Sequence, residues 1–182
     1  YSTQELGFSS LNHNVVYAQM TRGKNERSAS FAIGALAATL SKYAMDVCLY
    51  SGQDFNFFEL DTKYTTGSSI MPHKHNPDGF ELVRAKCNKL QSLPQELNMI
   101  LTNLPTGYHR DLQILKESFM PAFQELQDCL DVTIAMTENL EVNSSLIDEK
   151  KYDLLFTVEE VNQHVLNGTP FRDAYKQVAE NL

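Results

Sequence analysis

The residues whose types could do chemistry lie together in one segment, residues 65–78, with the sequence TTGSSIMPHKHNPD. The stretches on both sides favour helix, and loops held by a rigid scaffold are where binding groups concentrate. Gly67 gives the backbone conformational freedom and lets a ligand approach closely. The serine hydroxyls and local N–H groups, with the donors of Lys74 and Asn76, could surround a carboxylate and stabilise charge that develops on it.

Other chemistries fit this segment less well. A phosphate loop needs G-x-x-x-x-G-K-[ST], and no second glycine lies between Gly67 and Lys74. A nucleophilic serine at a strained elbow needs G-x-S-x-G, which the segment lacks. His73 and His75 could ligate a metal, but no third ligand is identifiable and the lysine between them disfavours a cation, so we predict no metal site. From spacing alone, a plain flexible loop stays open as an alternative.

Composition excludes several classes of protein. The chain has 182 residues, the length of about one domain. Its net charge of −8 argues against nucleic-acid binding, which needs a basic patch. Hydrophobic residues make up 42% of the chain and charged residues 21%, so the chain is expected to be globular and not disordered.

Cysteine usage and hydropathy point to the cytoplasm. Cys48, Cys87 and Cys129 are too widely spaced for a disulfide framework or a C-x-x-C metal site, and we predict buried thiols in a reducing compartment. The longest apolar stretch, residues 31–40, has about half the length that a membrane span needs. The first residues lack the basic region of a signal peptide. We therefore expect no membrane association.

The elements that must position the segment are helical, because strand alternation is nearly absent. We predict a short helix near 14–20 and a long one over 25–50, which is apolar all round and therefore buried in a bundle. A helix over 80–104 carries one apolar stripe and should kink at Pro94. A third helix should run over 112–140, with Pro121 bending it or delaying its start.

The apolar stripe of the third helix is long, and it implies partner helices of matching length. It comprises Leu112, Leu115, Phe119, Ala122, Leu126, Cys129, Thr133, Met136 and Leu140. We expect the long helices to associate across chains.

After residue 143 the pattern changes to short helices. Thr157 and Glu160 are spaced as a capping box, Asn167–Gly168 is typical of a helix end, and Thr169–Pro170 of a helix start. The prediction is an all-α fold. Residues 1–142 form part of a central helical bundle that carries the loop 65–78, and 143–182 form a small C-terminal helical region that we expect to be truncated.

Residues 67–77, GSSIMPHKHNP, resemble the signature GSSxMPxKxNP of the fumarase/aspartase superfamily. Residues 6–8, Asn14, 108–116 (YHRDLQILK) and 169–174 (TPFRDA) look like argininosuccinate lyases within it. The resemblance covers essentially the whole chain and places it in the later portion of a longer protein.

The resemblance implies a bundle of long helices followed by a small helical region. The implied reaction is anti β-elimination of fumarate from argininosuccinate to give arginine, a step of arginine biosynthesis. It implies no cofactor, a small-molecule substrate, and a homotetramer whose active sites are shared between subunits. The superfamily's catalytic histidine lies in an earlier segment that this sequence does not contain, so we expect the chain alone to be inactive.

The resemblance also implies roles for individual residues. Ser68 matches the general base, Lys74 the lysine that stabilises the substrate carboxylate, and Glu81 a glutamate that orients the site. The substrate-binding positions are matched by Ser69, Asn76, Tyr108, Gln113 and Lys116. From the residues alone, core packing stays open for Tyr108, and a solvated helix face stays open for Gln113 and Lys116.

Two features bear on the choice within the superfamily. His75 stands where members often carry a second lysine. Residues 108–116 favour argininosuccinate lyase over adenylosuccinate lyase, whose loop is similar. A non-catalytic structural homologue is the remaining alternative, and the intact Ser68 and Lys74 argue against it.

Overall fold

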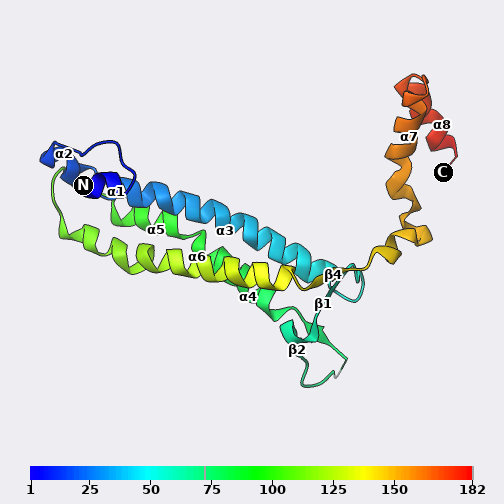
Figure 1. Ribbon diagram of the computed structural model, residues 1–182, viewed down its shortest axis with the longest axis horizontal. Helices are drawn as coiled ribbons and strands as arrows, with labels where there is room; N and C mark the ends of the chain where they lie inside the picture. The colour runs from blue at the N-terminus through cyan, green and yellow to red at the C-terminus, as the bar shows by residue number, and fades with distance from the viewer. Residues whose placement is uncertain (72, 182) are drawn as a thin grey trace. The chain divides into compact units, whose positions relative to one another are not determined.

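The computed structural model describes residues 1–71 and 73–181 and is mostly helical (Figure 1). The chain divides into two compact units, Tyr1–Glu141 and Val142–Leu182. The prediction of an all-α fold is confirmed. The four strands that the described residues form are two or three residues long.

The first unit is a bundle of long helices with a small β region at one end. Its α-helices are α1 (Ser2–Glu5), α2 (Val15–Met20), α3 (Lys24–Tyr50), α4 (Asp78–Leu90), α5 (Leu93–Ile100) and α6 (Leu115–Thr137). Two 3-10 helices are η1 (Thr62–Tyr64) and η2 (Arg110–Gln113). Strand β1 (Phe58–Leu60) pairs with β4 (Leu140–Val142), and β2 (Thr66–Gly67) pairs with β3 (His75–Asn76).

The core of the bundle lies where α3 packs against α4, α5 and α6. Phe80 of α4 and Leu97 of α5 are 0% exposed, and Val47 of α3 is also buried. The stripe predicted for the third helix faces this core, since its members are buried except for the partly buried Phe119 and Leu140. Most of them lie in α6, while Leu112 lies in η2 and Leu140 in β4. Full burial of one such side chain stabilises the fold by roughly 1.5–3 kcal/mol, so the stripe fixes which face of α6 points inward.

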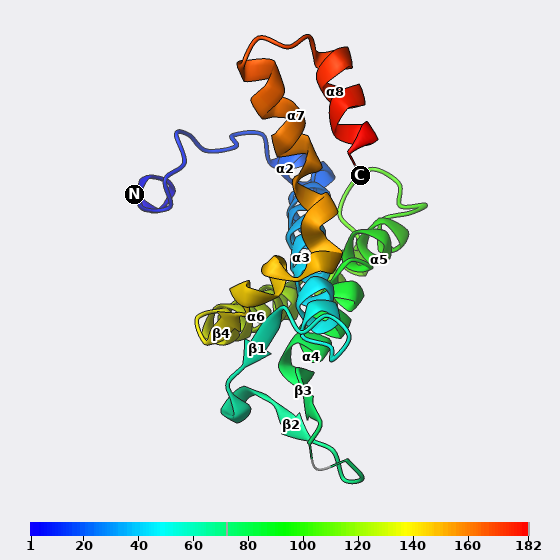
Figure 2. The same ribbon diagram turned by 90° about the vertical axis from the view of Figure 1, so that its right-hand side faces the viewer.

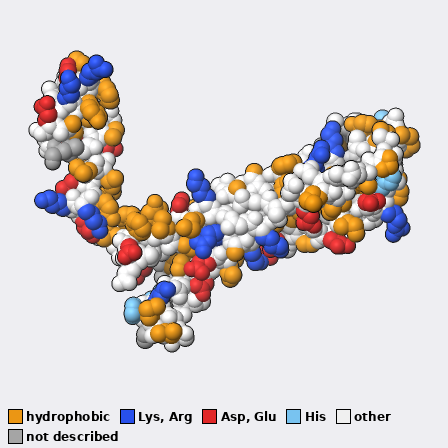
Figure 3. Space-filling model, turned by 180° about the vertical axis from the view of Figure 1, so that it is seen from behind, with side chains coloured by type: hydrophobic (Ala, Val, Ile, Leu, Met, Phe, Trp, Pro, Cys, Tyr) orange, Lys and Arg blue, Asp and Glu red, His pale blue; other side chains and the backbone are white. Residues whose placement is uncertain are grey.

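The prediction that α3 is buried all round is wrong. Its buried residues form one stripe, namely Ser30, Ile33, Gly34, Ala37, Ser41, Ala44 and Val47. Phe31 and Leu36 lie outside this stripe and are exposed, and so are Met120 and Ile134 of α6. Figure 3 shows hydrophobic side chains on the bundle surface among charged ones. Within this chain three helices cover only one side of α3.

Polar contacts between helices fix their register. Ser41 Oγ of α3 donates to Asn88 Oδ1 of α4 at 2.6 Å, and Lys89 Nζ of α4 lies 3.1 Å from Glu125 Oε2 of α6. The ion pair is largely exposed on its lysine side, so we assign it at most about 1 kcal/mol. These contacts orient the helices, while the apolar core supplies the stability.

Pro94 does not kink one continuous helix as predicted, and of the two effects predicted for Pro121 the structure excludes the delayed start. In place of one kinked helix, the chain forms α4 and α5 with a break at Gln91–Ser92, and Pro94 lies in the first turn of α5. A proline is tolerated there because the first N–H groups of a helix have no partner within it. Pro121 lies inside α6, which begins at Leu115, so the proline does not delay the helix start.

The second unit contains the 3-10 helices η3 (Ser144–Asp148) and η4 (Lys150–Phe156), followed by α7 (Thr157–Leu166) and α8 (Phe171–Glu180). Val161 of α7 packs with Ala174 and Val178 of α8 in a small core of its own.

The helix ends of this unit were predicted with mixed success. The end at Asn167–Gly168 is confirmed: Gly168 has a φ of 95°, and the N–H of Thr169 donates to the carbonyl of His164 at 3.0 Å, as in a Schellman motif. The capping box is wrong, because Thr157 already lies inside α7 and its hydroxyl donates to the carbonyl of Leu154. The start of α8 lies one residue later than predicted, with Pro170 as its N-cap.

Two of the three cysteines are buried thiols, as predicted. Cys87 and Cys129 are buried, Cys48 is half-buried, and all are free. Burial raises the pKa of Cys87 to about 12 and also raises that of Cys129. These thiols therefore stay neutral near pH 7 and pack as small apolar groups.

Helix α3 is also long and apolar enough to cross a membrane, and among the described residues it is the single helix that is. Core helices share this composition, and α3 packs on α4, α5 and α6. These contacts account for the apolar residues on the buried side of α3.

Position 23, at the start of α3, requires glycine because of its backbone conformation and because of the side chain beside it. Its φ is 85°, and a Cβ there would overlap the side chain of Leu101. We expect Gly23→Ala to lower the free energy of unfolding by about 2 kcal/mol or more, measured by urea denaturation. The control is Gly67→Ala, where a Cβ would meet no atom within 4 Å, and equal losses in both variants would contradict this account.

Candidate functional site

The signature segment forms a hairpin that projects from the end of the bundle (Figures 1 and 2). Its strands β2 and β3 are antiparallel, with Thr66 opposite Asn76 and Gly67 opposite His75. The side chain of Asn76 donates from Nδ2 to the carbonyl of Thr66 at 3.4 Å, and the Thr66 hydroxyl donates to the carboxylate of Asp78 in the first turn of α4. These hydrogen bonds connect the hairpin to a core helix. Its tip, of which residues 68–71 and 73–74 are described, carries the predicted base and lysine.

Ser68 is held at the tip by its own loop. Its Oγ accepts hydrogen bonds from the backbone N–H groups of Ile70 at 3.2 Å and Met71 at 3.1 Å. N–H donors stabilise negative charge on an oxygen, so this geometry favours proton transfer through Oγ. A serine hydroxyl is a poor base near neutral pH unless its surroundings activate it, and within this chain two N–H groups donate to its oxygen.

The other predicted site residues in or beside the hairpin are exposed or half-buried. Ser69 and Lys74 are exposed, and within the described part of the chain Lys74 makes no ion pair. Asn76 is half-buried. Glu81 is exposed in the first turn of α4, where the positive end of the helix dipole favours a carboxylate. The exposed ammonium of Lys74 is therefore available to an anionic substrate.

His75, the departure from the usual signature, has a partner in the hairpin. Its Nδ1 lies 3.4 Å from the hydroxyl of Thr65. It lies in β3 at the base of the hairpin and not at the tip with Ser68. The imidazole is therefore accommodated without displacing the residues of the tip.

A second group of predicted residues lies between α5 and α6. Tyr108 precedes η2, Gln113 is the last residue of η2, and Lys116 lies in the first turn of α6. Lys116 Nζ donates to Gln113 Oε1 at 2.9 Å. The Tyr108 side chain is 55% exposed, so core packing is the wrong interpretation of it.

Arg22 is a partner of this group that sequence reasoning missed. Its guanidinium carbon lies 5.1 Å from the centre of the Tyr108 ring, a cation–π contact. Arg22 lies between α2 and α3, far from Tyr108 in sequence. Only an alignment of homologues showing covariation between the two positions could have indicated the pair.

The two groups lie at opposite ends of α3 (Figure 1). The hairpin follows β1, beyond the C-terminal end of α3, while Arg22 and Tyr108 meet at its N-terminal end. A helix of 27 residues is about 40 Å long. One chain therefore does not bring both groups to one small substrate.

No metal site is evident in the part of the chain that the structure describes, because no three histidine, cysteine or carboxylate side chains are grouped there. The donors that converge in the hairpin are N–H, hydroxyl, amide and ammonium groups. They suit an anionic substrate better than a cation.

Comparison with known proteins agrees with the signature. A family model described as lyase matches residues 3–92. The chain is 61% identical over 181 residues to an argininosuccinate lyase of Parabacteroides distasonis, an alignment that covers 100% of this chain and 41% of that protein. The chain belongs to the argininosuccinate lyase family. A more distant member of this family, from Xanthomonas oryzae pv. oryzae, is 38% identical over 99% of the chain and 42% of its own length.

The chain spans about two fifths of the length of these argininosuccinate lyases. Among solved structures, EDDS lyase in complex with formate has a TM-score of 0.75 at 20% identity, covering 96% of this chain and 35% of that one. A class II fumarase from Schistosoma mansoni has a TM-score of 0.66 at 18% identity, covering 92% and 38%. At such identities the likeness shows only that this chain shares its fold with parts of these two proteins.

Proposed function

We propose that the whole protein carrying this chain is an argininosuccinate lyase, which eliminates fumarate from argininosuccinate and releases arginine. The observation that carries the proposal is the Ser68 hydroxyl, held by two N–H groups at the tip of an intact signature hairpin. The 61% identity to a named argininosuccinate lyase supports the choice of substrate.

In this mechanism Ser68 Oγ removes the proton from the carbon next to a substrate carboxylate. The charge that develops moves onto that carboxylate, so the intermediate is an aci-carboxylate. Lys74 and Asn76 donate hydrogen bonds to it and lower its energy. The C–N bond then breaks, and the leaving nitrogen takes a proton from an acid outside this chain. No cofactor takes part in these steps.

We further propose that the site is shared between subunits of a homotetramer. The hairpin and the Tyr108–Lys116 group lie at opposite ends of a helix about 40 Å long. If both groups contact one substrate, they must come from different chains. The exposed apolar residues of α3 and α6, such as Phe31 and Ile134, offer surface for such an association. We place this assembly in the cytoplasm.

The test is an absorbance assay of fumarate formation with the full-length protein. We expect fumarate from argininosuccinate and none from adenylosuccinate. Activity with adenylosuccinate alone would favour the related lyase. A folded protein that turns over neither substrate would favour a structural homologue and overturn the proposal.

We expect Lys74→Ala to impair both binding and turnover, because the change removes a charge that attracts the substrate and stabilises the carbanion. KM should rise and kcat should fall, each by roughly tenfold or more. The matched control is Lys176→Ala, an exposed lysine of α8 without an ion pair among the described residues. A variant with normal KM and kcat would remove Lys74 from the mechanism.

A further inference from the structure

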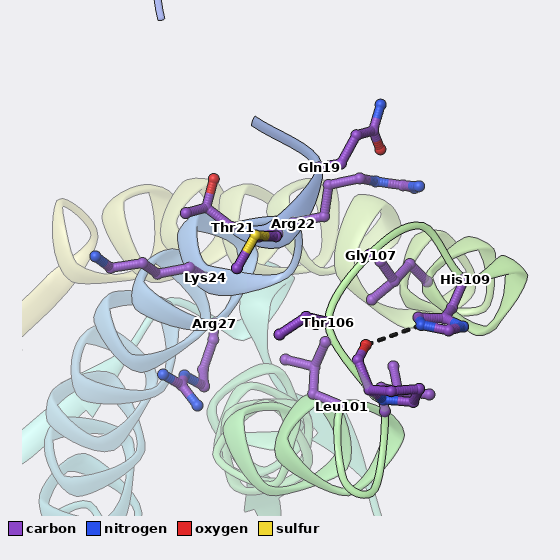
Figure 4. A pocket seen from close by; sticks show the side chains of 13 residues that line it. Gln19, Thr21, Arg22, Lys24, Arg27, Leu101, Thr106, Gly107 and His109 are labelled. Carbon is purple, nitrogen blue, oxygen red and sulfur yellow. Dashed lines mark hydrogen bonds between the residues drawn. The ribbon is translucent and has the colours of Figure 1, made fainter. Parts of the chain in front are cut away.

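A pocket of about 300 Å³ lies at the end of the bundle away from the hairpin (Figure 4). One wall is the α2–α3 junction, with Arg22, Lys24 and Arg27, and the other is the α5–α6 connection, with Thr106 and His109. Apolar side chains, among them Leu101 and Leu112, also line it. A volume at the lower end of the range for small-molecule sites suits a ligand of a few carbons.

The charged side chains among the described residues that line this pocket are all cationic. None of the described lining residues carries a carboxylate, although the chain as a whole has a net charge of −8. In the described part of the chain neither Arg22 nor Arg27 forms an ion pair. Cations gathered in one pocket without counter-charges repel one another, and a bound anion relieves that repulsion.

The acid nearest in sequence does not neutralise these arginines. Glu26 precedes Arg27, but its Oε2 accepts a hydrogen bond from the backbone N–H of Gly23 at 3.0 Å. The carboxylate is therefore used to close the first turn of α3. The N-terminal end of this long helix adds further positive potential to the same wall.

The two arginines approach the pocket from different sides. In Figure 4, Arg22 extends toward His109 and the α5–α6 connection, Arg27 descends from α3, and Lys24 extends the other way. The His109 ring is fixed because its Nε2 hydrogen-bonds with the carbonyl of Pro105 at 2.8 Å. The arrangement offers two separate guanidinium groups, and a guanidinium pairs well with a planar carboxylate.

We propose that this pocket binds a small dicarboxylate, with one carboxylate at Arg22 and the other at Arg27. The site is separate from the signature hairpin, which lies beyond the other end of α3. Because Arg22 also contacts the Tyr108 ring, an occupied pocket fixes the arginine that packs on a predicted substrate-binding residue. The dicarboxylate is either a free metabolite or part of a larger polycarboxylate, and the shared chemistry is two carboxylates a few carbons apart.

The test is calorimetric titration of the full-length protein with succinate, against neutral succinamide and inorganic phosphate. We expect saturable succinate binding, no succinamide binding, and weaker binding of phosphate, which offers one anionic group where succinate offers two. Succinate binding equal to that of succinamide, equal to that of phosphate, or absent would overturn the proposal. Competition by argininosuccinate would identify a larger polycarboxylate as the source, and its absence would identify a free dicarboxylate.

Variants separate this pocket from the hairpin. Arg22→Gln and Arg27→Gln should each weaken succinate binding roughly 10- to 100-fold, the loss expected for one charge-assisted contact. Lys74→Gln, which alters the hairpin, and Lys176→Gln, on α8, should leave this binding in place. Binding that is lost with Lys74→Gln, or that survives the change of both arginines, would place the ligand elsewhere. The argininosuccinate assay tests the proposed function separately, so either can fail alone.

Discussion

Ser68→Ala in the full-length protein is expected to lower kcat by roughly two orders of magnitude or more while KM changes little. A positioned acid–base group contributes about 100- to 10,000-fold to a rate, and the hydroxyl acts mainly in the transition state. The assay is fumarate formation from argininosuccinate under saturating conditions. Binding is checked separately by titration with substrate.

Control variants must separate loss of the base from a rearrangement of the hairpin tip. Removing Oγ leaves the N–H groups of Ile70 and Met71 without their acceptor, so part of the effect could come from a rearranged tip. Ser68→Thr keeps an oxygen acceptor, and Ser145→Ala removes an exposed hydroxyl from the second unit. A role limited to loop structure would raise KM together with the fall in kcat. Near-normal turnover in Ser68→Ala would show that the base lies elsewhere.

The helices could be predicted wherever the information was local. The stripe of α6 follows from a spacing of three to four residues, and the structure buries it against α3, α4 and α5. Hydrophobic periodicity reports one face of one helix, and this holds whatever the partner is. The same reasoning failed for α3, whose alanines occur on all sides although only one side meets other helices of this chain.

Features that depend on distant residues could not be predicted. The pairing of β1 with β4 joins segments on either side of three helices, and neither segment alternates over a useful length. The break at Gln91–Ser92 is weakly marked in sequence, since Pro94 predicts a kink and the chain forms a new helix around it. Sequence patterns carry little information about such partners, because the tertiary contact decides the outcome.

The candidate site also has features that local sequence predicts and features that only the tertiary structure determines. Ser68, Lys74 and Asn76 could be selected from one contiguous motif, and the structure places them in one hairpin. The motif did not show that two N–H groups would hold the Ser68 oxygen, because that depends on the turn the tip adopts. The motif also could not show that Tyr108 lies at the N-terminal end of α3, away from the hairpin. Its position there depends on how the helices are connected and packed.

This separation leads to a complementation experiment. Chains with Ser68→Ala and chains with Lys116→Met should each form nearly inactive assemblies, the first lacking its base and the second a predicted substrate contact. Co-expressed, they should regain activity. If each site takes its hairpin from one chain and its Tyr108–Lys116 group from another, some mixed sites receive both intact parts. With random assembly of equal amounts, about one quarter of the sites are intact, so we expect about one quarter of wild-type activity.

The matched control pairs Ser68→Ala with Lys74→Ala, two changes in the same hairpin. Every hairpin in that mixture carries one defect, so no site can be intact and activity should stay at the level of the single variants. Both mixtures contain the same Ser68→Ala chain, so any effect of that change on folding or association is common to both, and the amounts of assembled protein are matched before the assay. Recovery in neither mixture would mean that the two groups do not serve one shared site. Equal recovery in both would contradict the geometry, since α3 holds the two groups about 40 Å apart within a chain.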